Sequence, residues 1–462
     1  MKAFEGYQSP FSWRYGSSAM RQVWGEVNKR LLWRRLWVAM AEAQTEWGLV
    51  THEQVNDLKT HMRDVDMDSA LEIEKDIRHD LMAELKTFAS QCPLGGAILH
   101  LGATSMDIKD NAEVLQIAQS LDILIPKLAS LLTKLSEKID GFAEIAVMAF
   151  THLQPAEPTT LGYRLAGYGQ DLLEAYRTLK IVRCELKGKG FKGAVGNAAS
   201  YVMIYGQEGQ RQFEMLLSQA LALPFFEVAT QTYTRKQDYT VLSALAGLAA
   251  DAHKFAFDLR LLQSEMIGEM AEPFGADQVG SSAMPFKRNP VEAEKINSLA
   301  RTVSLAPLTA WNNHADSLLE RTLDDSANRR SLFPDTFLAV DEILMALEKI
   351  VDGLKTNRVM MQHNLDKFGP FAAIERVMMA AVKNGADRQE VHETLRQLSM
   401  AAWQDVQTGM GNPLFDLVSQ DQRITRWVSA GDLDQLFDVE HYTGFAAQRA
   451  RELAKKICAS VP

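Results

Sequence analysis

Apolar residues recur at alternating intervals of three and four residues along several long segments of the chain. This spacing predicts amphipathic helices, because residues three and four apart lie on the same side of an α-helix. Four series are Ile117, Leu121, Leu124, Leu128, Leu131 and Leu135; Leu161, Leu165, Tyr168, Leu172, Ala175, Leu179 and Val182; Val241, Leu245, Leu248, Ala252, Phe255, Leu259, Leu262 and Met266; and Phe333, Phe337, Val340, Leu344, Leu347 and Val351. A fifth segment begins at Pro290, continues through Ile296, Leu299 and Val303, and reaches Pro307, which we expect to kink the helix.

The five segments together predict an all-α protein with three helical domains around a long central five-helix bundle. Helices of roughly thirty residues are about 45–50 Å long at 1.5 Å per residue. No strand alternation of convincing length is present. We expect domain boundaries that give 1–104, 105–355 and 356–462, because the long series end near the second boundary and turn signals such as Asn384-Gly385 follow. Apolar faces left over on such long helices favour an oligomer.

The composition is that of a soluble globular protein and narrows the possible functions. Apolar residues make up 47% of the 462 residues and charged residues 23%, with a net charge of −10. This balance argues against a general nucleic-acid surface, and an anionic substrate needs a local cluster of cations. No continuous apolar run reaches the ~18 residues of a membrane span, and the N-terminus shows no signal-peptide pattern. Three widely spaced cysteines form no metal motif and suit a reducing compartment. We therefore expect a cytoplasmic protein that binds neither nucleic acid nor membranes.

One stretch, Gly280–Pro290, combines features of a ligand-binding loop. It contains two adjacent hydroxyls, Ser281 and Ser282, and ends in a pattern typical of a helix start. Asn289 is a candidate N-cap, Pro290 suits the first helical position, and Glu292 stands where a capping box requires a carboxylate. A hydroxyl-bearing loop before a helix N-terminus suits an anionic ligand. The alternative is an ordinary inter-helix loop whose hydroxyls bond the local backbone.

The stretch, whose sequence is GSSAMPFKRNP, resembles the signature loop of the fumarase/aspartase/argininosuccinate lyase superfamily. The segments Phe286–Asn289 and Arg321–Arg330 resemble the adenylosuccinate lyase family in particular, and the resemblance extends from Trp13 to Gly444. It implies an all-α superfamily lyase that requires no metal or organic cofactor. It also implies a homotetramer in which each active site draws residues from three subunits.

The resemblance implies a set of proton-transfer residues. His152, in a Thr-His-x-Gln-Pro string, takes the role of general acid, paired with the carboxylate of Glu294. Ser281 takes the role of general base, with Ser282 as the alternative. An unperturbed serine is a very poor base, so its surroundings must stabilise the alkoxide. Lys287 and Asn289 are suitable donors to the aci-carboxylate that forms during proton abstraction. By themselves, His152 and Glu294 are also compatible with a structural histidine and an exposed first-turn glutamate.

A second set of residues resembles the substrate-binding residues of that family. These are Arg14, Tyr15, Arg78, His79, Asp80, Thr104, Ser105, Gln231, Lys295, Arg321, Ser326 and Arg330. Two arginines and a serine are apt for a nucleotide monophosphate. The alternative for the charged groups is a solvated surface, and for Thr104 and Ser105 a capping role. The chain departs from the usual family pattern at Asn197, where a threonine is common, and at Lys295, where an arginine is common.

The implied activity is β-elimination of fumarate from adenylosuccinate, giving AMP, and from the succinyl carboxamide ribotide of purine biosynthesis. Two other interpretations stay open at this point. One is a different lyase of the superfamily, such as argininosuccinate lyase or fumarase. The other is a structural protein that reuses the helical bundle without catalysis.

Overall fold

The computed structural model describes residues 5–461, and these form two compact units. Residues 1–4, which begin the N-terminal stretch considered for a signal peptide, and residue 462 lie outside the described residues. The first unit comprises the described residues up to Lys127 together with Ala175–Ala250 and Ser298–Leu344. The second unit comprises Leu128–Glu174, Asp251–Asn297 and the described residues from Met345 onward. The three-domain division remains a prediction.

Five long or central helices contribute residues to both units. They are α6 (Ser105–Gly141), α7 (Leu161–Glu185), α9 (Lys236–Leu262), α10 (Val291–Val303) and α12 (Asp324–Asp352). Their apolar series pack inward as predicted, and Leu121, Leu165, Leu245 and Phe337, for example, are completely buried. Such burial contributes about 1.5–3 kcal/mol for each large apolar side chain, which is what holds helices of this length together.

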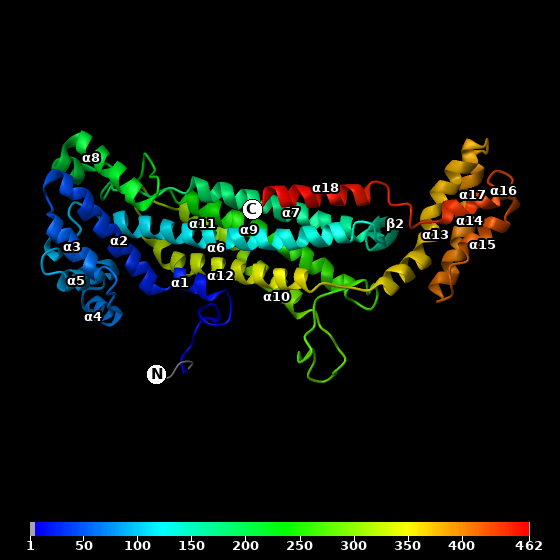
Figure 1. Cartoon of the computed structure of the whole chain (residues 1–462), viewed down its shortest axis with the longest axis horizontal. Coiled ribbons are helices and arrows are strands. Elements are labelled where there is room, and N and C mark those ends of the chain that lie inside the picture. Colours follow the sequence, from blue (N-terminus) through cyan, green and yellow to red (C-terminus); the bar gives the residue numbers. More distant parts are fainter. Residues whose placement is uncertain (1–4, 462) are drawn as a thin grey trace. The chain divides into compact units, whose positions relative to one another are not determined.

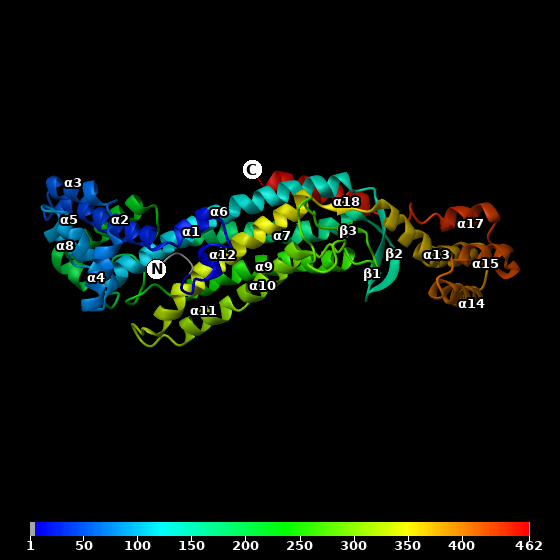
Figure 2. The same ribbon diagram turned by 90° about the horizontal axis from the view of Figure 1, so that it is seen from below.

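The first unit also contains shorter helices. They are α1 (Ser18–Val23), α2 (Glu26–Gln44), α3 (His52–His61), α4 (Met67–Ile77), α5 (Asp80–Gln91), α8 (Ala199–Leu221) and α11 (Ala306–Ala315), with short 3-10 turns at Pro10–Ser12, Thr45–Trp47 and Gly96–Ile98. Figure 1 and Figure 2 both show α2, α3, α4 and α5 gathered together, with α8 beside α2. Trp33 and Trp37 of α2 are almost fully buried in this group.

The second unit adds a β-hairpin and a C-terminal helical group. Its elements are β1 (Ala146–Thr151), β2 (Gln154–Thr160), β3 (Met270–Ala271), β4 (Lys355–Thr356), α13 (Arg358–Lys383), α14 (Arg388–Gln407), α15 (Leu414–Gln420), α16 (Gln422–Thr425), α17 (Ala430–Phe437) and α18 (Ala446–Ser460). Helices α14, α15 and α17 pack against α13 (Figure 1). Both sheets are antiparallel pairs, β1 with β2 and β3 with β4.

The all-α prediction is confirmed, and three local predictions are wrong. The β1–β2 hairpin was not predicted, because Pro155 and Pro158 in β2 obscure a strand pattern. Pro307 does not kink one helix; it lies in the first turn of α11 and separates it from α10. Met266 lies beyond the end of α9 and is 86% exposed, so it does not belong to the buried series.

Helix α6 is long and apolar enough to cross a membrane if length and composition are the only criteria. It contains an 18-residue window with a mean hydropathy of 1.3, although charged residues interrupt the apolar run. Because 61% of that window is buried inside the structure, α6 packs as a core helix of the protein.

Candidate functional site

The segment Arg78-His79-Asp80 joins α4 to α5 through an unusual turn in the first unit. Arg78 has a left-handed backbone, with φ 53°, and ends α4. His79 caps α5: its Nδ1 accepts the backbone N–H of Met82 at 3.3 Å, so the ring proton of the neutral form lies on Nε2. That nitrogen lies 3.4 Å from the hydroxyl oxygen of Ser105, which begins α6. The turn therefore brings two predicted substrate-binding residues together.

Asp80 is buried and is surrounded by hydrogen-bond donors. Its two carboxylate oxygens each accept a bond of 2.9 Å from the Nζ of Lys109, and one oxygen lies 3.1 Å from the Arg330 guanidinium. The backbone N–H of Leu81 donates at 2.7 Å. Burial raises the pKa of the Asp80 carboxyl, but Lys109, Leu81 and Arg330 outweigh it and hold that pKa well below its usual range. The carboxylate is therefore ionised throughout the physiological range.

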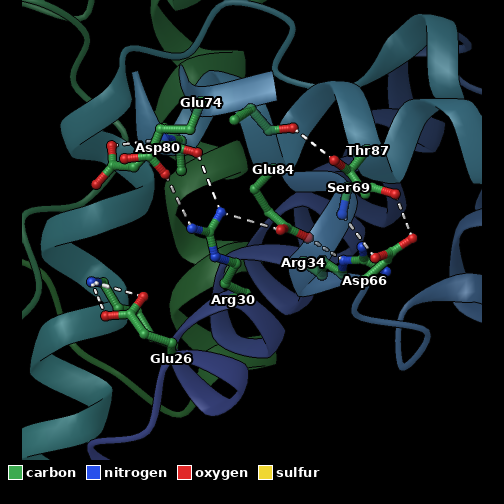
Figure 3. A network of polar contacts seen from close by, with 12 residues as sticks. Glu26, Arg30, Arg34, Asp66, Ser69, Glu74, Asp80, Glu84 and Thr87 are labelled. Carbon is green, nitrogen blue, oxygen red and sulfur yellow. Dashed lines mark hydrogen bonds and ion pairs between the residues drawn. The ribbon is translucent and has the colours of Figure 1, made fainter. Parts of the chain in front are cut away.

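A network of buried charges fixes the backbone at Asp80 (Figure 3). Arg30 and Arg34 lie one turn apart on α2, and both donate to the carboxylate of Glu84 on α5, at 3.3 and 2.6 Å. Arg30 also pairs with Glu74 on α4 at 3.4 Å and donates to the backbone oxygen of Asp80 at 3.4 Å. Glu84 and both arginines are almost fully buried. Ion pairs therefore connect α2, α4 and α5, and removal of one charge would leave its partner buried without a counter-ion.

Arg321, Ser326 and Arg330 line one cavity of about 140 Å³ in the first unit, as do Asp80 and Lys109. Ser326 and Arg330 stand on the first turns of α12, and Arg321 precedes the helix. Arg321 pairs with Asp325 at 2.8 Å, whereas the Arg330 side chain is 55% exposed. The cavity thus presents guanidinium groups and a hydroxyl, which are the donors that a phosphate requires.

A buried ion-pair network supports this cavity and was not predicted from the sequence. Arg329 donates to Asp238 at 2.9 Å and lies 2.7 Å from Glu113. Arg235 pairs with Asp110 at 3.1 Å and with Asp325 at 2.8 Å. Burial raises the pKa of Asp325, but Arg235, Arg329 and Arg321 together lower it further than burial raises it.

The sequence did contain a signal for this network. Asp238 is three residues before Val241, and Arg329 is four residues before Phe333. Both charged residues therefore lie on the same side of their helix as the apolar series. A charged residue on a buried helix face requires a buried partner of opposite charge. Nothing in the sequence indicated which partner each would find.

Asp107 joins Thr104 to a turn at Gly193–Asn197 that contains two glycines. The Thr104 N–H donates to Asp107 at 3.0 Å, and the same carboxylate accepts the Gly193 N–H at 3.2 Å and pairs with buried Lys189. The side-chain oxygen of Asn197 accepts the backbone N–H of Ala199 at 3.1 Å, so in this structure it bonds the backbone two residues further along the chain.

Seven other predicted residues of the first unit do not line the cavity: Arg14, Tyr15, Arg78, His79, Thr104, Ser105 and Gln231. Arg14 lies over the rings of Trp13 and Tyr15, with its Cζ 5.7 and 6.0 Å from the two centroids. Gln231 donates its backbone N–H to the Glu320 oxygen at 3.1 Å, beside the segment that carries Arg321. The cavity therefore groups Asp80, Arg321, Ser326 and Arg330, and the other seven predicted residues of this unit lie outside it.

His152 stands at the tip of the β1–β2 hairpin in the second unit. His152 and Leu153 both have a left-handed backbone, with φ 54° and 60°, and they connect the paired residues Thr151 and Gln154. A two-residue turn of this kind usually contains glycine or asparagine, so the backbone here is strained. Both side chains are exposed, and within the described residues His152 makes no hydrogen bond or ion pair.

The signature loop is exposed from Ser282 to Arg288 and partly buried at its two ends, and hydrogen bonds within the loop organise it. The Ser281 oxygen accepts the N–H groups of Ala283 and Met284, at 3.3 and 3.1 Å. Asn289 donates its side-chain N–H to the Gly280 oxygen at 2.9 Å. A Cβ at Gly280 would lie 2.1 Å from the Lys287 backbone oxygen, so only glycine fits there. In Figure 1 this segment before α10 contains no helix.

The predicted cap of α10 is wrong. Buried Glu272, not Asn289, accepts the N–H groups of Glu292 and Ala293, at 3.1 and 2.9 Å. Burial raises the pKa of Glu272. The Glu292 side chain does not form a capping box either, since it pairs with Lys295 at 2.7 Å and with Lys349 at 2.8 Å. A carboxylate twenty residues earlier in the chain satisfies the helix terminus, and no local sequence rule identifies it.

The catalytic residues predicted for the second unit are not in contact in this chain. Glu294 is half exposed and pairs with Arg260 at 3.5 Å. Lys287 is exposed and has no ion pair among residues 5–461. No interaction joins His152 to Ser281 or to Glu294 in this part of the chain. Their roles remain predictions. No group of histidine, cysteine, aspartate and glutamate side chains within the described residues has the arrangement of a metal site.

The chain is similar to known families over nearly its full length. A family model described as "Lyase" matches residues 6–305, and one described as "Adenylosuccinate lyase C-terminus" matches residues 370–453. The adenylosuccinate lyase of Schistosoma mansoni is 40% identical, over 91% of this chain and 89% of that protein. The adenylosuccinate lyase of Saccharomyces cerevisiae is 36% identical, over 99% of this chain and 95% of that protein.

Solved structures share the fold. The 3-carboxy-cis,cis-muconate lactonizing enzyme from Pseudomonas putida has a TM-score of 0.86 at 25% identity, over 98% of this chain and 100% of that one. A fumarate lyase from Mesorhizobium sp. BNC1 has a TM-score of 0.84 at 23% identity, over 97% of this chain and 99% of that one. At such identities the likeness concerns the fold and not the substrate.

Proposed function

The chain belongs to the adenylosuccinate lyase family, and from this we propose that it cleaves adenylosuccinate into AMP and fumarate. The observation that carries the proposal beyond the family match is the cavity at the start of α12. There Arg321, Ser326 and Arg330 present donors for one phosphate group inside a strongly acidic chain. Argininosuccinate and malate carry no phosphate, so this cavity favours a nucleotide over the substrates of the other lyases.

The elimination proceeds by removal of one proton and addition of another. Ser281, as its alkoxide, takes the proton from the succinyl carbon next to a carboxylate. The electron pair of that C–H bond moves first into the neighbouring carboxylate, which becomes the aci-carboxylate. It then forms the double bond of fumarate as the C–N bond breaks, and His152 donates a proton to the departing nitrogen. Two backbone N–H groups already donate to the Ser281 oxygen, and such donors lower the energy of an alkoxide. Lys287 and Asn289 stabilise the aci-carboxylate, and Glu294 supports His152.

The same elimination serves the succinyl carboxamide ribotide of purine biosynthesis. This substrate also has a succinyl group on nitrogen and a ribose phosphate, so the phosphate-binding groups and the proton-transfer groups keep their roles. We propose that the chain acts on both substrates in the cytoplasm.

A direct assay of fumarate release from both purified substrates tests the activity. The proposal predicts turnover of adenylosuccinate to equimolar AMP and fumarate, and no turnover of argininosuccinate or malate. AMP should also raise the thermal unfolding midpoint, because a ligand of the folded state stabilises it, whereas arginine should not. A protein that releases no fumarate from either succinyl nucleotide would instead support the structural, non-catalytic interpretation.

We further propose that the chain forms a homotetramer whose active sites draw residues from three subunits. Supporting this, Leu305, Leu308 and Trp311 at α11 are 65%, 60% and 52% exposed. Apolar surface of this kind is typical of a subunit interface. Inactive Ser281→Ala and His152→Ala proteins should regain activity when they are dissociated together and reassembled. Co-purification of differently tagged subunits must first prove exchange. Proven exchange without recovered activity contradicts shared sites.

A further inference from the structure

Lys109 lies in the cavity but belongs to none of the motifs that point to the function. It stands on the second turn of α6, and its Nζ lies 2.9 Å from both carboxylate oxygens of Asp80. In this symmetric contact, the ammonium group of Lys109 is a counter-ion to the Asp80 carboxylate. Its side chain is 23% exposed, against 10% for Asp80.

Few other cations can neutralise the Asp80 carboxylate. Arg30 reaches only its backbone oxygen and is bound to Glu74 and Glu84. The Nδ1 of His79 lies 3.8 Å from the carboxylate but accepts the Met82 N–H, so it can gain a proton only by losing that cap. Apart from this histidine, the ion pairs of Asp80 within residues 5–461 are those with Lys109 and Arg330.

Arg330 therefore has two competing partners. One is the buried carboxylate of Asp80, 3.1 Å away, and the other is the nucleotide phosphate. A buried carboxylate without a cation is costly, so Arg330 can turn to phosphate only if a second cation remains at Asp80. We propose that Lys109 is a positioning residue for phosphate binding: it neutralises Asp80 and leaves the Arg330 guanidinium available to the phosphate. This inference rests on the proposed function, because it requires a nucleotide monophosphate as ligand.

The cavity contains a matched control for Lys109. Lys29 lines the same cavity and is 21% exposed. Its Nζ lies 5.6 Å from the centroid of the Trp33 ring, and that of Lys109 lies 5.8 Å away. Lys29 pairs with Glu26 at 3.0 Å, however, and not with Asp80. Replacement of either lysine removes one positive charge from the same cavity. Only replacement of Lys109 removes a counter-ion of Asp80, so that Arg330 must neutralise this carboxylate.

The test is the dissociation constant of AMP, measured by calorimetry on the full chain at fixed ionic strength, with adenosine as the ligand without phosphate. Lys109→Met should weaken AMP binding about tenfold, a usual size for coupling between two sites, and should leave adenosine binding within about twofold. Lys29→Met should weaken AMP binding much less. Lys109→Arg should bind AMP as the unaltered chain does.

The decisive comparison is made in the Asp80→Asn background. A neutral side chain no longer requires a counter-ion, so Lys109→Met should then change AMP affinity by less than about twofold. This comparison holds even if Lys109→Met alone disturbs the fold. A tenfold loss that persists in the Asp80→Asn background would overturn the inference, because Lys109 would then act on the phosphate directly. Unchanged AMP binding by Lys109→Met in the original chain would overturn it as well. Failure of the unaltered chain to bind AMP would contradict the proposed function itself.

Discussion

The residues proposed to bind phosphate, in the first unit, differ from the residues proposed to transfer protons, in the second unit, in how far they are buried and paired. Arg329, which supports the cavity, is 6% exposed and pairs with two carboxylates. Arg330 is more exposed but still pairs with Asp80. His152, in contrast, is exposed at the end of a strained hairpin and has no polar partner among the described residues.

This difference separates two tasks. A cavity that must hold a phosphate needs several cations close together, and their repulsion is tolerable only when buried carboxylates lie between them. Groups that transfer protons must instead reach the reacting atoms of the substrate, and they acquire their final surroundings when it is bound. We therefore expect changes in the first unit to affect stability and binding, and changes in the loop and hairpin to affect turnover.

The largest effect is expected for Ser281→Ala. Loss of the general base should lower kcat by about 10²–10⁴-fold, while AMP affinity stays within about twofold. His152→Ala should behave alike. Ser282→Ala is the matched control and should keep nearly normal turnover in the fumarate-release assay. The reverse result, with Ser282→Ala inactive and Ser281→Ala active, would move the base to Ser282.

Arg329→Met should be the most destabilising of the cavity variants. It leaves the buried carboxylate of Asp238 without its guanidinium and removes a partner of Glu113, and breaking a buried pair costs about 3–5 kcal/mol. Arg330→Met, one residue further along the same helix, should cost less than about 1 kcal/mol because that pair is partly exposed. Thermal unfolding at equal protein concentration compares the two. Equal midpoints would show that burial does not distinguish these arginines.

Arg330→Ala should raise KM about tenfold and leave kcat within about twofold, because the phosphate is remote from the bond that breaks. Lys109 still neutralises Asp80 in this variant, so the fold is retained. Steady-state kinetics with adenylosuccinate provides the check. A low kcat with an unchanged KM would count against a phosphate role for Arg330.

The smallest effect is expected at the hairpin. Leu153 is 72% exposed and has φ 60°, so Leu153→Gly relieves backbone strain and removes little apolar burial. We expect a gain of about 1 kcal/mol in the free energy of unfolding. Leu49, exposed but outside this turn, is the control position, and Leu49→Gly should not stabilise. A loss of stability in Leu153→Gly would show that the turn is not strained.

The sequence predicted the helices because their signal is local and repeated. Leu121, Leu165 and Phe337 lie on buried faces as their spacing indicated. The hairpin escaped prediction because prolines interrupt β2, and the cap of α10 escaped because Glu272 reaches it through space.

The candidate site was predicted where a continuous motif existed, and only there. Arg321, Ser326 and Arg330 lie in one string and line one cavity. Lys109, on α6, and Arg235, which precedes α9, could be assigned to the cavity only from the fold, which brings them beside α12. A single charged residue on a helix does not indicate its partner, since the partner lies elsewhere in the chain.

The central claim is that binding and proton transfer are carried by separate groups of residues. The most direct test is the affinity of the Ser281→Ala/His152→Ala double variant for AMP, measured by calorimetry after the variant is shown to release no fumarate. We predict a dissociation constant within about twofold of that of the unaltered chain, because AMP has no succinyl group for the loop and hairpin to contact. A tenfold or greater loss of AMP affinity, in a variant with an unchanged unfolding midpoint, would contradict the claim.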